Sequence, residues 1–147
     1  MAEITIRPIQ EGDQQGWRRL FTAYLDFYKE RIEEEIFTST FKRFLSNDLW
    51  APSCFVAVAD GTLVGFVHYL YHAHCWRIKR VCYLQDLFAE ASYRGQGIGR
   101  RLIERVYEQA EKDNAPTVYW FTEGENLDAR KLYEKVATVS SFVKYQR

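Results

Sequence analysis

Hydrophobic and polar positions alternate in some stretches of the chain and recur at helical spacing in others, and this pattern predicts an order of elements. Residues 3–9 alternate, as is typical of a strand, and Pro8 favours an edge position or the end of that strand. Asp13 is a candidate N-cap for the helix that follows. The apolar face of this helix carries aromatic residues at helical spacing, namely Trp17, Phe21, Tyr24 and Tyr28.

A second short helix is predicted over residues 37–45, followed by three strands. The first two, residues 54–59 and 62–71, form a hairpin through the turn dipeptide Asp60-Gly61, and Gly65 indicates a bulge in the second. Residues 77–80 are predicted to form a basic loop, and residues 80–88 the next strand.

The second half of the chain predicts a helix at 98–113, a strand at 117–122, a helix capped by Asn126 and a final strand at 141–145. A strand–helix–strand order from 83 to 122 requires a right-handed parallel crossover, whereas the hairpins require antiparallel pairs. We therefore expect one domain over residues 1–147 of the α/β (α+β) class. Its twisted central sheet would be mixed but mostly antiparallel, with helices on both faces.

Charge and cysteine content narrow the function classes. Twenty basic and twenty acidic residues cancel, so no general nucleic-acid binding is expected. No apolar run is long enough to span a membrane, and the N-terminus lacks the pattern of a signal peptide. The three cysteines have no Cys-x-x-Cys spacing and are typical of a reducing compartment. We expect a cytoplasmic protein without a membrane partner.

The segment Arg94-Gly95-Gln96-Gly97-Ile98-Gly99 stands where a strand passes into a helix. Alternating glycines at a helix N-terminus present several backbone N–H groups without side chains in the way, and the helix dipole adds positive potential. Arg94 and Arg100 add full charges. The physical interpretation is an anion site suited to phosphates, and the alternative is a tight strand-to-helix turn.

This loop does not fit the Gly-x-Gly-x-x-Gly fingerprint of dinucleotide-binding proteins, because its third glycine comes one residue early. It does not fit a Walker loop either, because Arg100 and Arg101 follow the last glycine where that motif has Lys and Ser or Thr. It resembles instead the Arg-Gly-x-Gly-x-Gly loop with which GNAT N-acetyltransferases bind the pyrophosphate of coenzyme A. The segments at 83–88 and 126–133 also resemble that family. The similarity is strong over residues 52–136, weak over 1–50, and greatest to the small polyamine- and histone-type acetyltransferases.

The resemblance implies acetyl-CoA as acetyl donor and assigns roles to residues. The catalytic residues would be Leu87, whose N–H would serve as oxyanion donor, and Tyr133, which would protonate the leaving sulfur. The implied cofactor-binding residues are Leu87, Phe88, Ala89, Arg94, Gly95, Gln96, Gly97, Ile98, Gly99, Arg100, Asn126, Arg130 and Tyr133. Asn126 has the alternative role of a helix cap, and Tyr133 that of a core residue.

The general base is left open by the sequence. Polyamine-type relatives have a glutamate where this chain has Gln85, and an amide cannot act as a base. Strict alternation would turn the neighbouring Asp86 to the opposite face of the sheet. The remaining candidates are Glu123, Glu125, a residue of Glu33–Glu35, or no protein base at all.

The acceptor is predicted to be a small cationic amine, such as a polyamine or diamine, or a lysine-like amine. Three carboxylates at Glu33–Glu35 would attract such a cation, and the alternative is a solvated turn. The aromatic helix face would be mainly core, with a lesser role in the acceptor site. The candidate substrate-binding residues are Tyr24, Glu33, Glu34, Gln85 and Glu123.

Several alternatives remain open at this level. Because Gln85 cannot act as a base, a non-catalytic CoA-binding or regulatory module is an alternative function. The glycine loop is also compatible with a nucleotide-binding protein. His68, His72, His74 and Cys75 lie close in sequence, but their spacing does not predict a metal site. The tail after Tyr133 resembles histone-type members that pair C-terminal strands, which predicts a homodimer.

Overall fold

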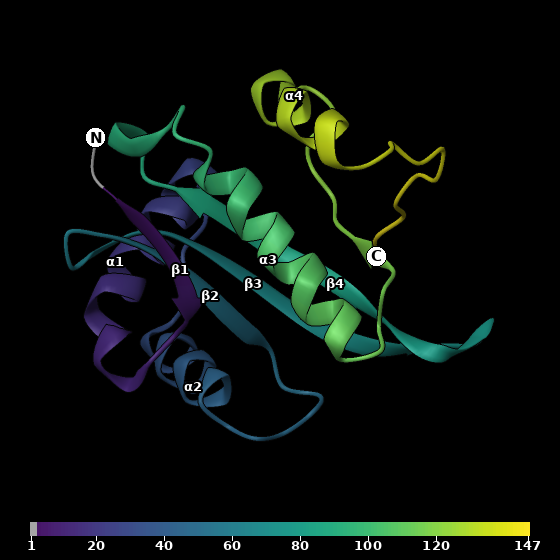
Figure 1. Cartoon of the computed structure of the whole chain (residues 1–147), viewed down its shortest axis with the longest axis horizontal. Coiled ribbons are helices and arrows are strands. Elements are labelled where there is room, and N and C mark those ends of the chain that lie inside the picture. The colour runs from purple at the N-terminus through teal and green to yellow at the C-terminus, as the bar shows by residue number, and fades with distance from the viewer. Residues whose placement is uncertain (1–2) are drawn as a thin grey trace.

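The computed structural model describes residues 3–147, which form one five-stranded sheet and four helices (Figure 1). The strands lie in the order β1-β2-β3-β4-β5. Neighbours from β1 to β4 are antiparallel, and β4 and β5 are parallel. The bounds are β1 Ile4–Pro8, α1 Gln14–Phe27, α2 Glu34–Phe44, β2 Ser53–Ala59, β3 Thr62–His74, β4 Arg77–Ala89, α3 Ile98–Lys112, β5 Val118–Tyr119 and α4 Leu127–Val136. The mixed, mostly antiparallel sheet is therefore confirmed.

Two hydrophobic clusters cover the two faces of this sheet. One joins α1 and α2 to the sheet through buried side chains that include Trp17, Leu20, Phe21, Phe37 and Phe41. The other is formed largely by α3, whose apolar residues recur at the predicted spacing, with α4 packing against it. Figure 1 shows α3 crossing the front of the sheet, on the side opposite α1 and α2. Helices thus lie on both faces, as predicted.

The predicted hairpin between β2 and β3 is present. Asp60 and Gly61 both have positive φ, 49° and 77°, as a tight two-residue turn requires. Val58 pairs with Leu63 and Ala57 with Gly65, so Val64 is an extra residue and the predicted bulge lies at this point. The backbone of β4 approaches Gly65 closely here, because an added Cβ would lie 2.9 Å from the Phe88 oxygen.

Three sequence predictions are wrong in extent. Residues 77–80 belong to β4 rather than to a loop, because the β3–β4 hairpin runs past the core with both faces solvated, which gives it a polar composition. The strand at 117–122 shortens to Val118–Tyr119, since pairing with β4 stops at Tyr83. No strand forms over 141–145 in the described chain, where alternation finds no neighbouring strand to pair with.

Asp13 occupies the predicted N-cap position of α1, but its side chain makes no cap hydrogen bond. Its carboxylate accepts from Arg7 at 2.7 Å and from the Gln10 N–H at 2.8 Å. The residue therefore ties β1 to the start of α1 through partners three and six residues earlier in the chain, instead of capping α1 itself.

Gly65→Ala tests the close approach of β3 and β4. The new methyl group would meet the Phe88 oxygen and, at 3.0 Å, Ile98 Cγ2, so the strands or α3 must shift. We expect urea unfolding to show a loss of about 1–3 kcal/mol in the free energy of unfolding. Gly12→Ala is the matched control, since nothing lies within 4 Å of its added Cβ, and it should change stability little. Equal effects of the two substitutions would contradict the packing constraint.

Candidate active site

The glycine loop enters α3 through two residues that need glycine. Gly95 and Gly97 have φ values of 81° and 77°, and nothing lies within 4 Å of a Cβ added to either. Gly97 is the N-cap of α3, and Ile98 behind it is buried in the core. The loop therefore presents bare backbone N–H groups at a helix N-terminus, which suits a phosphate group.

The third glycine has a different role. An added Cβ on Gly99 would lie 3.1 Å from Leu132 Cδ2, so this position allows α3 to pack closely against α4. Arg94 and Arg100 are exposed at the loop, where Arg94 donates to the Ala89 oxygen at 3.3 Å and Arg100 pairs with Glu104. The side chain of Gln96 is half-buried between them.

The strand that leads to this loop has an open edge. On the side of β4 away from β3, no strand of residues 3–147 pairs with β4 beyond Tyr83. We call this unpaired side of residues 87–89 the open edge. The Glu90 N–H donates to the Val64 oxygen, on the β3 side. Alternation therefore turns the N–H groups of Ala89 and Leu87 to the open edge. The N–H of Phe88 faces β3, and its side chain packs in the cluster beneath α1.

A bulge at Gln85 produces this arrangement. Tyr69 pairs with Leu84 and His68 with Asp86, so Gln85 is an extra residue. Ahead of the bulge, the Cys82 N–H points toward β5 and donates to the Thr117 oxygen. If the strand alternated without a bulge, the Leu87 N–H, five residues later, would point the opposite way, toward β3.

The bulge also corrects the expectation for Asp86. Leu84 and Leu87 both pack on the α3 side, so Gln85 and Asp86 between them lie on the α1 side. The expectation that Asp86 points away from the face of Gln85 is therefore wrong, because the extra residue breaks strict alternation. Gln85 itself is exposed.

A hydrogen-bonded chain of four side chains runs from the core to this face. Trp17 Nε1 donates to His68 Nε2 at 2.9 Å, and His68 Nδ1 lies 2.8 Å from Asp86 Oδ2. The Tyr24 hydroxyl donates to Asp86 Oδ1 at 2.8 Å. The sequence analysis named only Tyr24 of these four as a site residue, since no local pattern links residues 17, 68 and 86.

Tyrosines surround the exposed end of this chain. Burial raises the pKa of Tyr24 well above its ordinary value, and the charge on Asp86 raises it further. Burial and then the charges of Asp86 and Glu123 raise the pKa of Tyr28, whose ring centroid lies 5.0 Å from that of Tyr24. Tyr28 was not predicted as a site residue, although its i, i+4 spacing from Tyr24 was a usable signal.

Tyr133 joins this group from α4. Burial raises its pKa to about 12, with a further contribution from Tyr28, so the phenol stays protonated throughout the physiological range. Its ring packs edge-on against Trp120 at a centroid distance of 5.4 Å. It is therefore half-buried, packed against the core cluster on one side and close to Tyr28 on the other.

The remaining predicted residues are distributed as follows. Asn126 caps α4, accepting from the Ala129 N–H at 3.4 Å, and Arg130 donates to the Gly124 oxygen at 3.0 Å. Glu123 lies in the exposed loop after β5. Glu33 is exposed at the N-cap of α2, and Glu34 forms an ion pair with Arg18, a contact that directs it toward the first half of α1.

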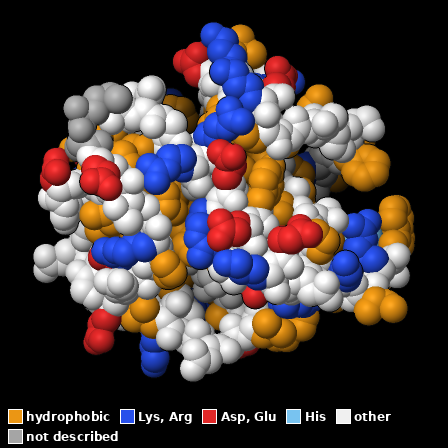
Figure 2. Space-filling model, viewed as in Figure 1, with side chains coloured by type: hydrophobic (Ala, Val, Ile, Leu, Met, Phe, Trp, Pro, Cys, Tyr) orange, Lys and Arg blue, Asp and Glu red, His pale blue; other side chains and the backbone are white. Residues whose placement is uncertain are grey.

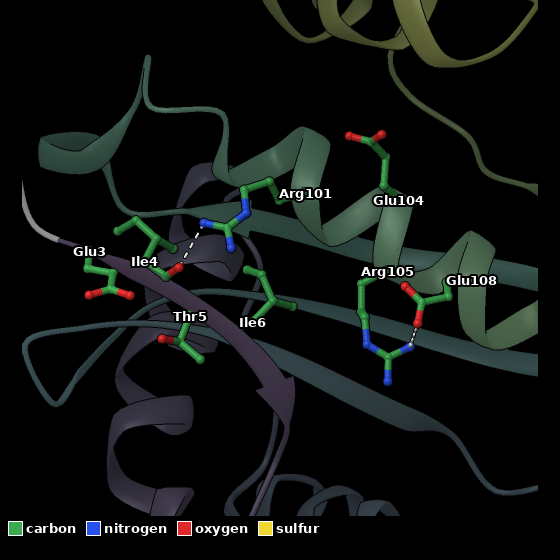
Figure 3. Close-up of a pocket in the computed structure, with 8 residues that line it drawn as sticks. All are labelled: Glu3, Ile4, Thr5, Ile6, Arg101, Glu104, Arg105 and Glu108. Carbon is green, nitrogen blue, oxygen red and sulfur yellow. Dashed lines mark hydrogen bonds and ion pairs between the residues drawn. The ribbon is translucent and has the colours of Figure 1, made fainter.

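A hollow of about 570 Å³ lies elsewhere, between β1 and α3 (Figure 3). Arg101 spans it and donates to the Ile4 oxygen at 2.8 Å. This hollow borders the opposite edge of the sheet from β4, so it does not belong to the candidate site. In residues 3–147, no three potential metal-binding side chains come together, and no helix is long and apolar enough to cross a membrane.

Comparison with known proteins gives a consistent result. The family model described as the acetyltransferase (GNAT) family matches residues 17–137. A D-amino-acid N-acetyltransferase of Saccharomyces cerevisiae is 37% identical over 146 residues, which cover 98% of this chain and 90% of that protein. A thialysine N-epsilon-acetyltransferase of Bos taurus is 29% identical over 118 residues, covering 75% of this chain and 69% of that protein.

Solved structures share the fold. A ribosomal-protein-alanine N-acetyltransferase from Brucella melitensis superposes with a TM-score of 0.81 at 21% identity, covering 99% of this chain and 98% of that one. An aminoglycoside N-acetyltransferase in complex with CoA gives a TM-score of 0.83 at 18% identity, covering 100% and 95%. On the family match and the curated relatives, this chain belongs to the GNAT acetyltransferase family and is an N-acetyltransferase.

Proposed function

We propose that this protein transfers the acetyl group of acetyl-CoA to a small primary amine that is cationic in solution, such as a polyamine, a diamine or a lysine-like amine. The observation that carries the proposal is the open edge of β4, which runs from Asp86 and the tyrosines to the glycine loop. A ligand along this edge would bring its phosphates to the loop and its other end to the tyrosines.

The residues present fit acetyl-CoA. Bare N–H groups at Gly95 and Gly97, with the charges of Arg94 and Arg100, suit a pyrophosphate. The Leu87 and Ala89 N–H groups would hold the acetyl carbonyl and the amide-bearing arm, with Leu87 also stabilising the developing oxyanion. Asn126 and Arg130 would hold the arm from the α4 side. Acetyl-CoA supplies an acyl group activated as a thioester.

Acetyl transfer requires that the amine be neutral when it attacks and that the sulfur leave as a thiol or thiolate. A lysine-like amine has a pKa of about 10.4, so reaching its neutral form at pH 7 costs about 4.6 kcal/mol. The leaving thiol, with a pKa of about 8.5 by analogy with cysteine, needs little help. Tyr133, with its pKa raised to about 12, would hydrogen-bond the sulfur as a donor and would not give up its proton fully.

A second acceptor class follows from one observation. The yeast relative, at 37% identity, acts by its name on D-amino acids, so the α-amine of an amino acid is a candidate. The acidic side chains Asp86 and Glu123 near Tyr28 favour an acceptor without a carboxylate. The name of the bovine relative, which is that of a thialysine N-epsilon-acetyltransferase, supports the lysine-like class.

The direct experiment measures thiol release from acetyl-CoA across diamines, polyamines, lysine analogues, D- and L-amino acids and an aminoglycoside. We expect turnover with the cationic amines that lack a carboxylate near the reacting nitrogen. Preferred turnover of D-amino acids would establish the second class, and binding of acetyl-CoA without any turnover would contradict the proposal.

We also propose that residues 1–147 form a single N-acetyltransferase domain and that the protein functions in the reducing cytoplasm. The family match over residues 17–137 supports the first point. Three free cysteines, of which Cys75 is exposed, support the second. Figure 2 shows acidic and basic side chains interspersed on the displayed face, which supports the absence of a nucleic-acid partner.

We further propose a homodimer. The tail after α4 carries exposed hydrophobic side chains, namely Val139, Phe142, Val143 and Tyr145, and β5 lies at an edge of the sheet. A second copy would cover both features.

Gly97→Ala, compared with Gly61→Ala, tests the phosphate cradle. Both glycines have a φ of 77° and open space around an added Cβ, so each substitution should cost about 1–2 kcal/mol of stability through the backbone alone. Only Gly97→Ala should weaken CoA binding in calorimetry, by about tenfold or more. Equal CoA affinities for the two variants would contradict a ligand at this loop.

Tyr133→Phe tests the proposed hydrogen bond from Tyr133 to the leaving sulfur. Removing the hydroxyl should lower kcat by about 10- to 100-fold while leaving the KM for acetyl-CoA near its original value. Tyr107→Phe is the control, because Tyr107 packs near α4 and donates to the Val136 oxygen at 2.9 Å. An unchanged kcat for Tyr133→Phe would remove Tyr133 from the chemistry.

The double substitution Phe142→Glu with Tyr145→Glu tests the dimer. Sedimentation velocity should show a dimer for the original protein and a monomer for this variant, because two charges would enter an apolar contact. Trp76→Glu changes a comparably exposed aromatic side chain elsewhere and should leave the dimer intact. A monomeric original protein at micromolar concentration would end the proposal.

A further inference from the structure

The partner of His68 determines where its proton lies. The indole N–H of Trp17 can only donate, so His68 Nε2, at 2.9 Å, must accept. The imidazole proton is therefore on Nδ1, from which it donates to Asp86 Oδ2 at 2.8 Å. Trp17 thus fixes one tautomer of His68 and aims its N–H at Asp86.

The geometry at Nε2 leaves no place for a second donor on the imidazole. A second proton on Nε2 would set two N–H groups against each other, and His68 is only 3% exposed. Aromatic rings enclose it, with centroid distances of 4.9 Å to Phe21, 5.0 Å to Phe44 and 4.5 Å to Phe66. The rings hold the imidazole in place, and His68 offers Asp86 one hydrogen bond from Nδ1.

Asp86 is therefore an anion without a cation. Its side chain is 16% exposed and accepts one hydrogen bond from His68 and one from Tyr24. No lysine or arginine of residues 3–147 forms an ion pair with it. A carboxylate has about four lone-pair positions, so about two remain for a further donor.

The surroundings of Asp86 suit an ammonium group. Its charge acts on the hydroxyls of Tyr24, Tyr28 and Tyr83, so three tyrosines lie near it. Glu123 lies near Tyr28 and adds negative potential. Leu87, next to Asp86 in the chain, has its N–H at the open edge, where the acetyl carbonyl is proposed to bind.

We propose that Asp86 binds the acceptor as its ammonium ion and thereby determines specificity, with His68 as a positioning residue held in one tautomer by Trp17. This inference rests on the proposed function and names the residue that selects its acceptor. The substrate class is a primary amine that enters in its protonated form and releases one proton to solvent before its nitrogen attacks the acetyl carbonyl.

Asp86→Asn separates charge from shape. The amide oxygen can accept from His68, and its NH₂ group can donate to the Tyr24 hydroxyl, so the chain of hydrogen bonds is preserved without the charge. With the best cationic amine of the acceptor panel at pH 7, kcat/KM should fall by about 10- to 150-fold, mainly through KM. With aminoacetonitrile, a weakly basic amine that is neutral at pH 7, the loss should be less than about threefold.

Asp113→Asn is the matched control, because Asp113 also accepts from a tyrosine hydroxyl, that of Tyr71, but lies beyond the end of α3. It should leave both acceptors unaffected. Equal losses with the cationic and the neutral amine in Asp86→Asn would mean that the carboxylate only supports the fold, and would overturn the inference.

Two substitutions of His68 isolate its positioning role. His68→Asn keeps a donor close to the position of Nδ1, facing Asp86, whereas His68→Gln keeps an acceptor close to the position of Nε2, facing Trp17. Both should lower thermal stability to similar extents. Only His68→Gln should raise the KM for the cationic amine by about tenfold, since Asp86 then loses its donor. An equal KM in the two variants would overturn the positioning role.

The ¹⁵N chemical shifts of His68 provide a readout independent of activity. They should report the Nδ1–H tautomer, and the Nε2–H tautomer would contradict the assignment. Absence of turnover with every amine would refute the proposed function. Turnover in which Asp86→Asn matches Asp113→Asn would refute this inference alone.

Discussion

The site depends on the bulge at Gln85, where one extra residue in β4 changes the direction of every group after it. Before the bulge, even-numbered N–H groups face β5, as the Cys82 contact with Thr117 shows. After it, the Glu90 N–H faces β3, and the N–H groups of Leu87 and Ala89 face the open edge. The same shift turns Asp86 toward α1, where Tyr24 and His68 reach it. One backbone irregularity thus sets both the open edge and the acceptor side.

The two ends of the open edge are built by different physical means. At the glycine loop, positive φ values and the absence of side chains leave the backbone exposed at a helix N-terminus. At the other end, the tyrosines from α1 and α4 and the half-buried carboxylate of Asp86 create a negative environment that is partly shielded from water. A ligand that is anionic at one end and reacts with a cationic amine at the other matches this polarity.

Sequence reasoning worked where the determinants are local. The face of α3, the Asp60-Gly61 turn and the glycines at 95 and 97 each depend on a few neighbouring residues, and all were predictable. The Trp17–His68–Asp86 chain depends on residues 51 and 18 positions apart, and only the fold brings them together. Alternation failed at Asp86 because a bulge leaves no reliable local signal. The tail at 141–145 alternates as a strand does, but strands need a neighbour to pair with, which sequence alone does not supply.

Amide hydrogen exchange along β4 tests most directly whether the open edge holds the acetyl donor. The account predicts that the Leu87 and Ala89 amides exchange rapidly in the free protein and become protected when acetyl-CoA is added. The Glu90 amide, paired with Val64, should be protected in both states. Protection of Leu87 and Ala89 in the free protein, or exchange unchanged by acetyl-CoA, would contradict the account.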